Sequence, residues 1–192
     1  MLTQPEMYKI LEDSRAWSTG HYLLPNGRHG EHAVRASLIL QYPKMAEMMG
    51  SALAELWCES NGQAAVQSIM AINRQGLLLG YELARALNVR LLYIEKESSG
   101  TLVIKQGIRL IPDEKTLLVC DILTEHINLT EITDFIKKSR AAAMGLISLA
   151  EINIREAGAL PHRTLARFSF GDYDPAECPL CKANFPLEKP EE

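Results

Sequence analysis

An acidic residue stands between an apolar run and a helix start in the segment TLLVCDILTEHINLTE, residues 116–131. Three consecutive apolar residues at 117–119 are typical of a buried strand, and Asn128 and Thr130 are both suitable caps for a following helix. Between them, Asp121 opens a short polar loop. Backbone N–H groups at a helix start attract phosphate, so the pattern favours a site for a phosphorylated sugar. The loop contains no glycine, however, and this limits how closely its backbone can approach a ligand.

A second polar loop, NRQG at residues 73–76, follows the apolar run at 64–72. Arg74 can pair with an anion through two N–H groups, and Gly76 allows close approach of the backbone. The alternative is that Arg74 points to solvent or fills the space beside the loop. In parallel sheets, ligands bind beyond the carboxyl ends of the strands, so we expect both loops to lie at that edge.

The elements that must position these loops alternate between strand and helix. The spacing of apolar residues predicts helices at 2–15, 44–58, 77–87 and 128–139. Apolar and β-branched runs predict strands at 31–40, 64–72, 89–97, 116–123 and 141–152, with one or two more at 101–111. Residues 17–30 are rich in turn formers, and the proline-rich tail is expected to be loop. This alternation predicts an α/β fold with a central, mostly parallel sheet flanked by helices.

Composition excludes several classes of protein. The chain has 192 residues, which suits one domain or one domain with a small appendage. The net charge of −4 and the lack of a basic block argue against binding to nucleic acid. No apolar run reaches the length of a membrane span, and the acidic, amphipathic N-terminus is unlike a signal peptide. We therefore expect a cytoplasmic protein.

The cysteines leave one question open. Cys178 and Cys181 form a CPLC motif, which supplies two of the four ligands that a structural zinc site needs. Two free thiols in a turn of the tail, or a zinc site completed by His162 or by another chain, are the main alternatives. A redox pair is less favoured because no helix start follows to lower a thiol pKa. No metal ligand is assigned from the sequence, and the scattered histidines are expected at ordinary surface positions.

Longer segments resemble the orotate phosphoribosyltransferase family. GHYLLPNGRHGEHAVRASLILQYPKMAEMMGSALAEL resembles its N-terminal hood and first helix, and GYELARALNVRLLYIEKE the helix and strand after its pyrophosphate loop. IKQGIRLIPDEKTLLVCDILT resembles the approach to its phosphoribosyl-pyrophosphate motif, and DYDPAECPLCKANFPLEKP the tail of one branch. The resemblance covers nearly the whole chain in the same order. It implies a type I phosphoribosyltransferase fold, with an N-terminal helix and hood at 1–40, a core at 41–171 and a Pro/Cys tail at 172–192.

The resemblance also implies site residues, a cofactor and a partner. The positions that match the family's active site are Arg74, Gly76, Lys96, Lys105, Asp121, Thr124 and Asn128. Asp121 would hold the ribose hydroxyls and Thr124 the phosphate, while the three basic residues would neutralise the pyrophosphate. Lys96, Lys105 and Asp121 are thus the catalytic candidates, and the others bind substrate. The family also implies Mg²⁺, if the chain is active, and a homodimer in which a mobile loop reaches the other subunit's site.

The chain departs from the family where the phosphate should bind. Cys120 replaces the first of two adjacent acids, and Glu125, His126 and Ile127 replace a loop rich in threonine and glycine. Ile127 is β-branched and tolerates positive φ poorly. At about 5 Å and an effective dielectric near 20, a carboxylate repels each phosphate charge by about 3 kcal/mol. The loop is therefore expected to hold phosphate poorly or to hold something else.

Three functions stay open at this point. The first is an orotate phosphoribosyltransferase-like protein that is weak or inactive in transfer and binds a nucleotide or another anion. The second is an active enzyme that converts orotate and phosphoribosyl pyrophosphate to orotidine monophosphate in pyrimidine biosynthesis. The third is transfer to, or binding of, a different base or phosphosugar.

Overall fold

The computed structural model describes residues 2–24, 26–61, 66–104, 107–154 and 160–189. The helices are α1 (Gln4–Asp13), α2 (Ser37–Leu40), α3 (Pro43–Asn61), α4 (Arg74–Leu87), α5 (Leu129–Lys138) and α6 (Pro179–Lys182). The strands are β1 (Trp17–Leu23), β2 (His29–Val34), β3 (Ser68–Ala71), β4 (Arg90–Tyr93), β5 (Glu95–Lys96), β6 (Leu102–Val103), β7 (Lys115–Leu123), β8 (Ala142–Ile152), β9 (His162–Phe168) and β10 (Asp172–Tyr173).

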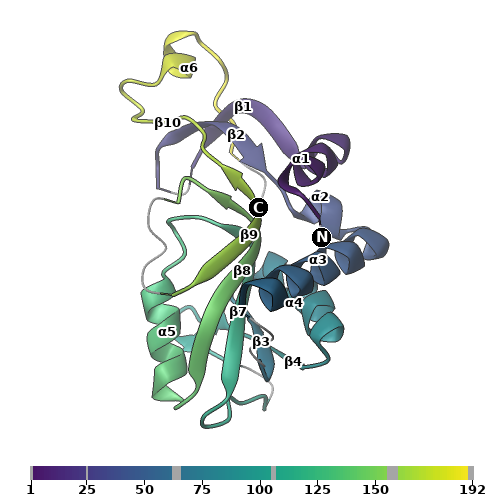
Figure 1. The fold of residues 1–192 in the computed structure, drawn as a ribbon. Helices are drawn as coiled ribbons and strands as arrows, with labels where there is room; N and C mark the ends of the chain where they lie inside the picture. The colour runs from purple at the N-terminus through teal and green to yellow at the C-terminus, as the bar shows by residue number, and fades with distance from the viewer. Residues whose placement is uncertain (1, 25, 62–65, 105–106, 155–159, 190–192) are drawn as a thin grey trace.

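The predicted α/β architecture is confirmed. Five parallel strands form the central sheet in the order β4-β3-β7-β8-β9, and α3 and α4 cover one face while α5 covers the other (Figure 1). A separate antiparallel sheet, β1-β2-β10, lies above the carboxyl ends of the central strands and forms the hood. Within the part of the chain that is described, no helix is both long and apolar enough to span a membrane.

Most predicted elements exist, but several segments differ, among them the tail expected to be loop, which contains β10 and α6. Residues 17–23, read as turn, form β1 because they pair with β2 from Trp17 opposite Val34 to Leu23 opposite His29. The strand expected at 31–40 ends at Val34, and a short helix follows at 37–40. The sequence also failed to predict β9, which pairs with β8 at the sheet edge. β1 and β9 are stabilised by pairing with a neighbouring strand, which the local pattern of either segment does not reveal.

Side chains of β7 alternate between two apolar clusters, one on each face of the sheet. Leu117 and Val119 pack into the cluster shared with α3 and α4. Leu118 and Cys120 pack into the other cluster, together with Ile132 and Ile136 of α5. Because neighbouring strand residues point to opposite faces, the side chain after Cys120 returns to the α4 side of the sheet. That side chain is Asp121, at the upper end of the strand.

Glu114, just before β7, is a buried carboxylate held by Arg90. Arg90 Nε and Nη2 each lie 2.7 Å from a different carboxylate oxygen of Glu114, and the Ile111 N–H donates to one of them at 2.9 Å. Burial alone raises the pKa of Glu114, but these hydrogen bonds outweigh it and hold the pKa below its usual value of 4.5. A lowered pKa stabilises the fold above about pH 4.5, and this contribution is lost as the pH falls through the folded-state pKa.

We therefore expect Arg90→Ala to lower the free energy of unfolding at pH 7 by about 2–4 kcal/mol, because it leaves a buried charge unpaired. Urea unfolding from pH 7 down to pH 3 should show the loss shrinking as Glu114 is protonated. Arg85→Ala is the control, since the Arg85 side chain is half exposed and pairs with the exposed Glu47 and the partly buried Glu82, and its loss should cost less than about 1 kcal/mol. A loss of equal size at every pH would contradict this account.

Candidate functional site

The ends of β3 and β7 are joined by a hydrogen bond between Asn73 and Asp121. Asn73 Nδ2 donates to Asp121 Oδ1 at 2.8 Å. The other side-chain atom, Asn73 Oδ1, accepts from the Gly76 N–H at 2.8 Å and so caps α4. One side chain thus fixes both the helix start and the carboxylate. The segment NRQG is therefore mostly the first turn of α4 and not a separate loop.

Gly76 is required where α4 passes over the end of β7. A Cβ atom on Gly76 would lie 2.5 Å from Asn73 Oδ1, 3.0 Å from Cys120 Cα and 3.2 Å from Val119 O. Two of these three atoms belong to the backbone and cannot move away cheaply. Gly76 therefore allows close packing between helix and strand, which keeps Asn73 in reach of Asp121.

Asp121 and Cys120 lie in different environments although they are neighbours in sequence. Asp121 is 7% exposed, and burial raises the pKa of its carboxyl although hydrogen bonds from the Ile122 N–H and the Asn73 amide oppose this. Cys120 is completely buried in the apolar cluster beneath α5, and burial raises the pKa of its thiol well above its usual value. The thiol is therefore neutral and does not face a ligand, so the first acid of the family motif has no equivalent here.

Several backbone N–H groups in and just after the loop between β7 and α5 donate within the chain. The Ile127 N–H donates to Thr124 O at 3.1 Å, and the Leu129 N–H to Ile127 O at 2.9 Å. Asn128 caps α5, and its side-chain oxygen accepts from the Glu131 N–H at 3.0 Å. Residues in this loop have no positive φ angle. The loop is thus a closed turn, in which these N–H groups are paired with the protein itself.

A cavity of about 360 Å³ lies between this loop and the hood. Asn73, Asp121 and Thr124 line its floor, and the hood contributes Tyr22 and His32. Its acidic side chains are Asp121, Glu125 and Asp172, and the last of these also pairs with Arg28 outside the cavity. Among the described residues that line this cavity there is no lysine or arginine. Its charged lining is therefore acidic, which opposes binding of a phosphate dianion, and two arginines, Arg28 and Arg167, line an adjoining cavity of about 880 Å³ that shares Glu125 and Asp172 with it.

A second cavity of about 350 Å³ adjoins the first at Asn73, which lines both. Arg74 and Lys96 line it together with Glu95 and Tyr93. The Lys96 ammonium lies 2.9 Å from Glu131 Oε2, so part of its charge is already balanced. This second cavity, which we call the basic cavity, brings two of the three basic candidates together.

The site residues expected from the sequence therefore fall into separate places. Asp121 and Thr124 line the first cavity, of about 360 Å³, which we call the acidic cavity. Arg74 and Lys96 line the basic cavity, and Lys105 lies outside the described residues. Gly76 donates its N–H to Asn73, the cap of α4, and Asn128 caps α5 by accepting from the Glu131 N–H. Asn73 was not among the residues expected at the site, although asparagine is one of the preferred residues at a helix N-cap.

No family model matches the chain. It is 31% identical over 186 residues to an orotate phosphoribosyltransferase of Caldicellulosiruptor bescii, which covers 95% of this chain and 94% of the relative. The crystal structure of orotate phosphoribosyltransferase from Aeropyrum pernix aligns with a TM-score of 0.68 at 15% identity, over 84% of this chain and 93% of that one. UMP synthase from Leishmania donovani aligns with a TM-score of 0.70 at 12% identity, over 85% of this chain but only 36% of that longer one. These structures share the type I phosphoribosyltransferase fold described above. At this identity and coverage, the chain belongs to the orotate phosphoribosyltransferase family.

Proposed function

We propose that this protein is weak or inactive in phosphoribosyl transfer and that it binds a nucleotide or another anion at the basic cavity. The observation that carries the proposal is the charge of the 360 Å³ cavity, where Asp121 and Glu125 face the space that a phosphosugar would occupy. A ligand with a 5′-phosphate would have to enter without a lysine or arginine among the described lining residues. Arg74 and Lys96 instead offer positive charge on the other side of Asn73.

The backbone of the loop supports the same proposal. A phosphate-binding loop needs N–H groups that turn toward the anion, but the N–H groups of Ile127 and Glu131 are already bonded within the chain. Each hydrogen bond to a charged group contributes about 1.5–3 kcal/mol. Losing two of them weakens binding by at least about a hundredfold.

Mg²⁺ would suit the acidic cavity better than phosphate alone. Carboxylate oxygens are the ligands that Mg²⁺ prefers, and Asp121 and Glu125 both line this space. Asp121 Oδ1 accepts from Asn73, which orients the carboxylate. If the protein is active, Mg²⁺ would supply the positive charge that the lining lacks.

An active orotate phosphoribosyltransferase is the second candidate. It is supported by membership of the family and by the pair Arg74 and Lys96, which could neutralise pyrophosphate as it leaves. Asp121 would then hold the ribose, and the product would be orotidine monophosphate. Transfer to a different base or phosphosugar would need the same basic cavity.

Titration calorimetry of phosphoribosyl pyrophosphate with Mg²⁺, followed by an assay of orotate consumption, separates these functions. We expect no saturable binding of the phosphosugar below millimolar concentration and no orotate consumption at high protein concentration. Pyrophosphate should still raise the melting temperature of the wild type more than that of Arg74→Ala, because a ligand stabilises by RT ln(1 + [L]/Kd). Micromolar binding together with orotate consumption would overturn the proposal in favour of the active enzyme.

We also propose a cytoplasmic homodimer. All four cysteines are free thiols, as is usual in a reducing compartment. Three large side chains, Tyr42, Leu78 and Tyr81, are more than half exposed near the start of α3 and along α4, and a second subunit would cover them. Light scattering should give twice the 21.4 kDa of one chain, and a mass of 21.4 kDa would exclude the dimer.

A further inference from the structure

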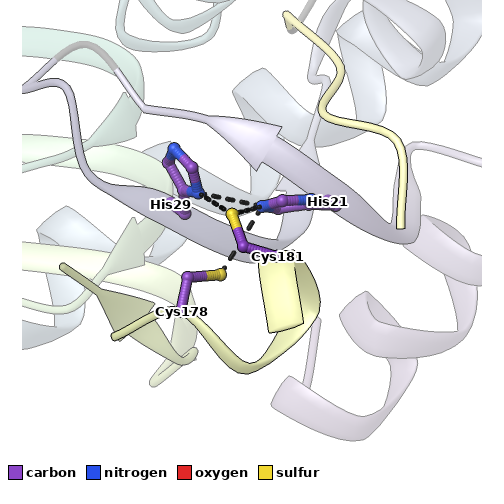
Figure 2. Close-up of side chains that lie close together, drawn as sticks. All are labelled: His21, His29, Cys178 and Cys181. Carbon is purple, nitrogen blue, oxygen red and sulfur yellow. Dashed lines mark hydrogen bonds between the residues drawn. The ribbon is translucent and has the colours of Figure 1, made fainter. Parts of the chain in front are cut away.

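Four side chains with metal-binding atoms converge where the C-terminal tail meets the hood (Figure 2). His21 comes from β1 and His29 from β2, while Cys178 precedes α6 and Cys181 lies within it. Their ligand atoms all lie within 4.8 Å of one another. We propose that these four residues bind one zinc ion, which fastens the tail to the hood.

The distances fit a tetrahedral ion. With zinc at about 2.0–2.1 Å from nitrogen and 2.3 Å from sulfur, a tetrahedron has N–N edges of about 3.3 Å and N–S edges of about 3.6 Å. His21 Nε2 lies 2.9 Å from His29 Nδ1. The Cys178 and Cys181 sulfurs lie 3.5 and 3.7 Å from His21 Nε2, and the Cys181 sulfur lies 3.2 Å from His29 Nδ1. These four edges need to change by only a few tenths of an ångström, and the remaining two, from the Cys178 sulfur to His29 Nδ1 and to the Cys181 sulfur, are no longer than 4.8 Å.

A hydrogen bond to the backbone prepares His21 to bind metal. His21 Nδ1 lies 2.9 Å from Phe185 O, and since a carbonyl oxygen only accepts, the ring proton belongs on Nδ1. The lone pair of Nε2 then points toward the two cysteines and His29. Metal-binding histidines in proteins usually make this second hydrogen bond, which fixes the tautomer and the ring orientation.

Burial makes the cluster unlike a chance surface grouping. His21 is 2% exposed, His29 is 6% exposed and Cys178 is fully buried, while Cys181 is at the exposed side of the cluster. Such polar groups are costly to bury unless they are satisfied, and a shared cation would satisfy all four ligand atoms at once. Two cysteine sulfurs and two imidazoles are a ligand set that favours zinc over Mg²⁺ or Ca²⁺.

The tail is built as a tight turn around the two cysteines. The Lys182 N–H donates to Cys178 O, and the Phe185 N–H to Leu180 O. Beyond this turn the tail runs beside β1, where the Glu188 N–H donates to His21 O at 2.7 Å and Glu188 O accepts from the Leu23 N–H at 2.8 Å. An ion at the turn would thus lock the tail against β1.

The site would be structural and not catalytic, because four protein ligands leave no open position. Its position still matters for the acidic cavity, since Tyr22 follows His21 directly and lines that cavity. His162, a ligand candidate from the sequence, takes no part. Its Nε2 lies 3.1 Å from Glu151 Oε2 on the neighbouring strand, so the alternative in which His162 completes the site is not supported.

Metal analysis of the full chain, purified under reducing conditions from zinc-supplemented culture, tests the proposal. We expect about one zinc per chain after dialysis against a weak chelator. Cys181→Ser and His29→Ala should each retain at least about tenfold less zinc, because even residues that only support a metal ligand cost 10–100-fold in affinity. Cys58→Ser and His162→Ala are the matched controls and should retain the wild-type amount.

Cobalt provides a readout that does not depend on how the variants fold. Titration of Co²⁺ into metal-free wild type should give the intense visible bands of a tetrahedral site and a thiolate charge-transfer band, and Zn²⁺ should remove them. The proposal is overturned if the wild type holds less than about a tenth of an ion per chain and Co²⁺ gives no such bands. It is also overturned if fresh protein carries a Cys178–Cys181 disulfide, or if Cys181→Ser holds as much zinc as the wild type.

Discussion

Cys120→Asp should destabilise the protein strongly instead of restoring the family's acidic pair. The new carboxyl would lie in the fully buried cluster beneath α5, among apolar side chains and beside the like charge of Asp121. Removing a charge from water without a partner costs several kcal/mol, so the group would take up a proton. We expect a loss of about 3–5 kcal/mol at pH 7 and a fall in melting temperature of about 2–4 °C for each kcal/mol.

The pH dependence identifies burial as the cause. A carboxyl whose folded-state pKa is raised causes little loss below its unfolded value of about 3.9, and the loss grows as the pH rises through the folded-state pKa. Urea unfolding of Cys120→Asp should therefore approach wild-type stability near pH 4 and fall behind it at pH 7. Cys58→Asp, the same change at a half-buried position of α3, should cost about 1 kcal/mol or less at either pH. Wild-type stability of Cys120→Asp at pH 7 would mean that position 120 can face the acidic cavity.

Much of the central sheet could be predicted because its signals are local. The apolar run at 117–119 and the N-cap Asn128 predicted β7 and α5, and both are confirmed. The hydrogen bond between Asn73 and Asp121 could be predicted only if the pairing of β3 with β7 were also known. Ala71 lies opposite Val119 in that register, so Asn73 and Asp121, two positions further along each strand, meet at the carboxyl end of the sheet.

The hood and its cluster of histidines and cysteines could not be predicted in the same way. His21 and Cys178 are 157 positions apart in sequence, and β10 joins the N-terminal strands only through tertiary pairing. The expectation that the histidines are ordinary surface residues was wrong for His21 and His29, which are both buried. The alternation of side chains along β7, by contrast, already implied that Cys120 and Asp121 face opposite sides of the sheet.

The triple variant Glu125→Thr, His126→Gly and Ile127→Gly should bind phosphoribosyl pyrophosphate with Mg²⁺ at least about tenfold more tightly than the wild type. Glycines let the loop backbone turn its N–H groups toward the 5′-phosphate, and two such hydrogen bonds contribute about 3–6 kcal/mol. Ordering two flexible glycines on binding costs about 1–2 kcal/mol of conformational entropy, which offsets part of that gain. Removing the Glu125 carboxylate adds less to the binding free energy than the full Coulomb repulsion, because this side chain is exposed and screened by solvent and salt.

Two partial variants separate backbone from charge. Glu125→Gln removes only the carboxylate, and we expect it to improve the dissociation constant about two- to fivefold, as is usual for a screened surface charge. The double variant of His126→Gly with Ile127→Gly keeps the carboxylate and should recover most of the tenfold gain. Calorimetry of all four proteins under one buffer and Mg²⁺ concentration gives the comparison. If the triple variant binds no better than the wild type, the closed turn at 124–128 is not what weakens phosphate binding, and the missing positive charge around the cavity becomes the sufficient cause.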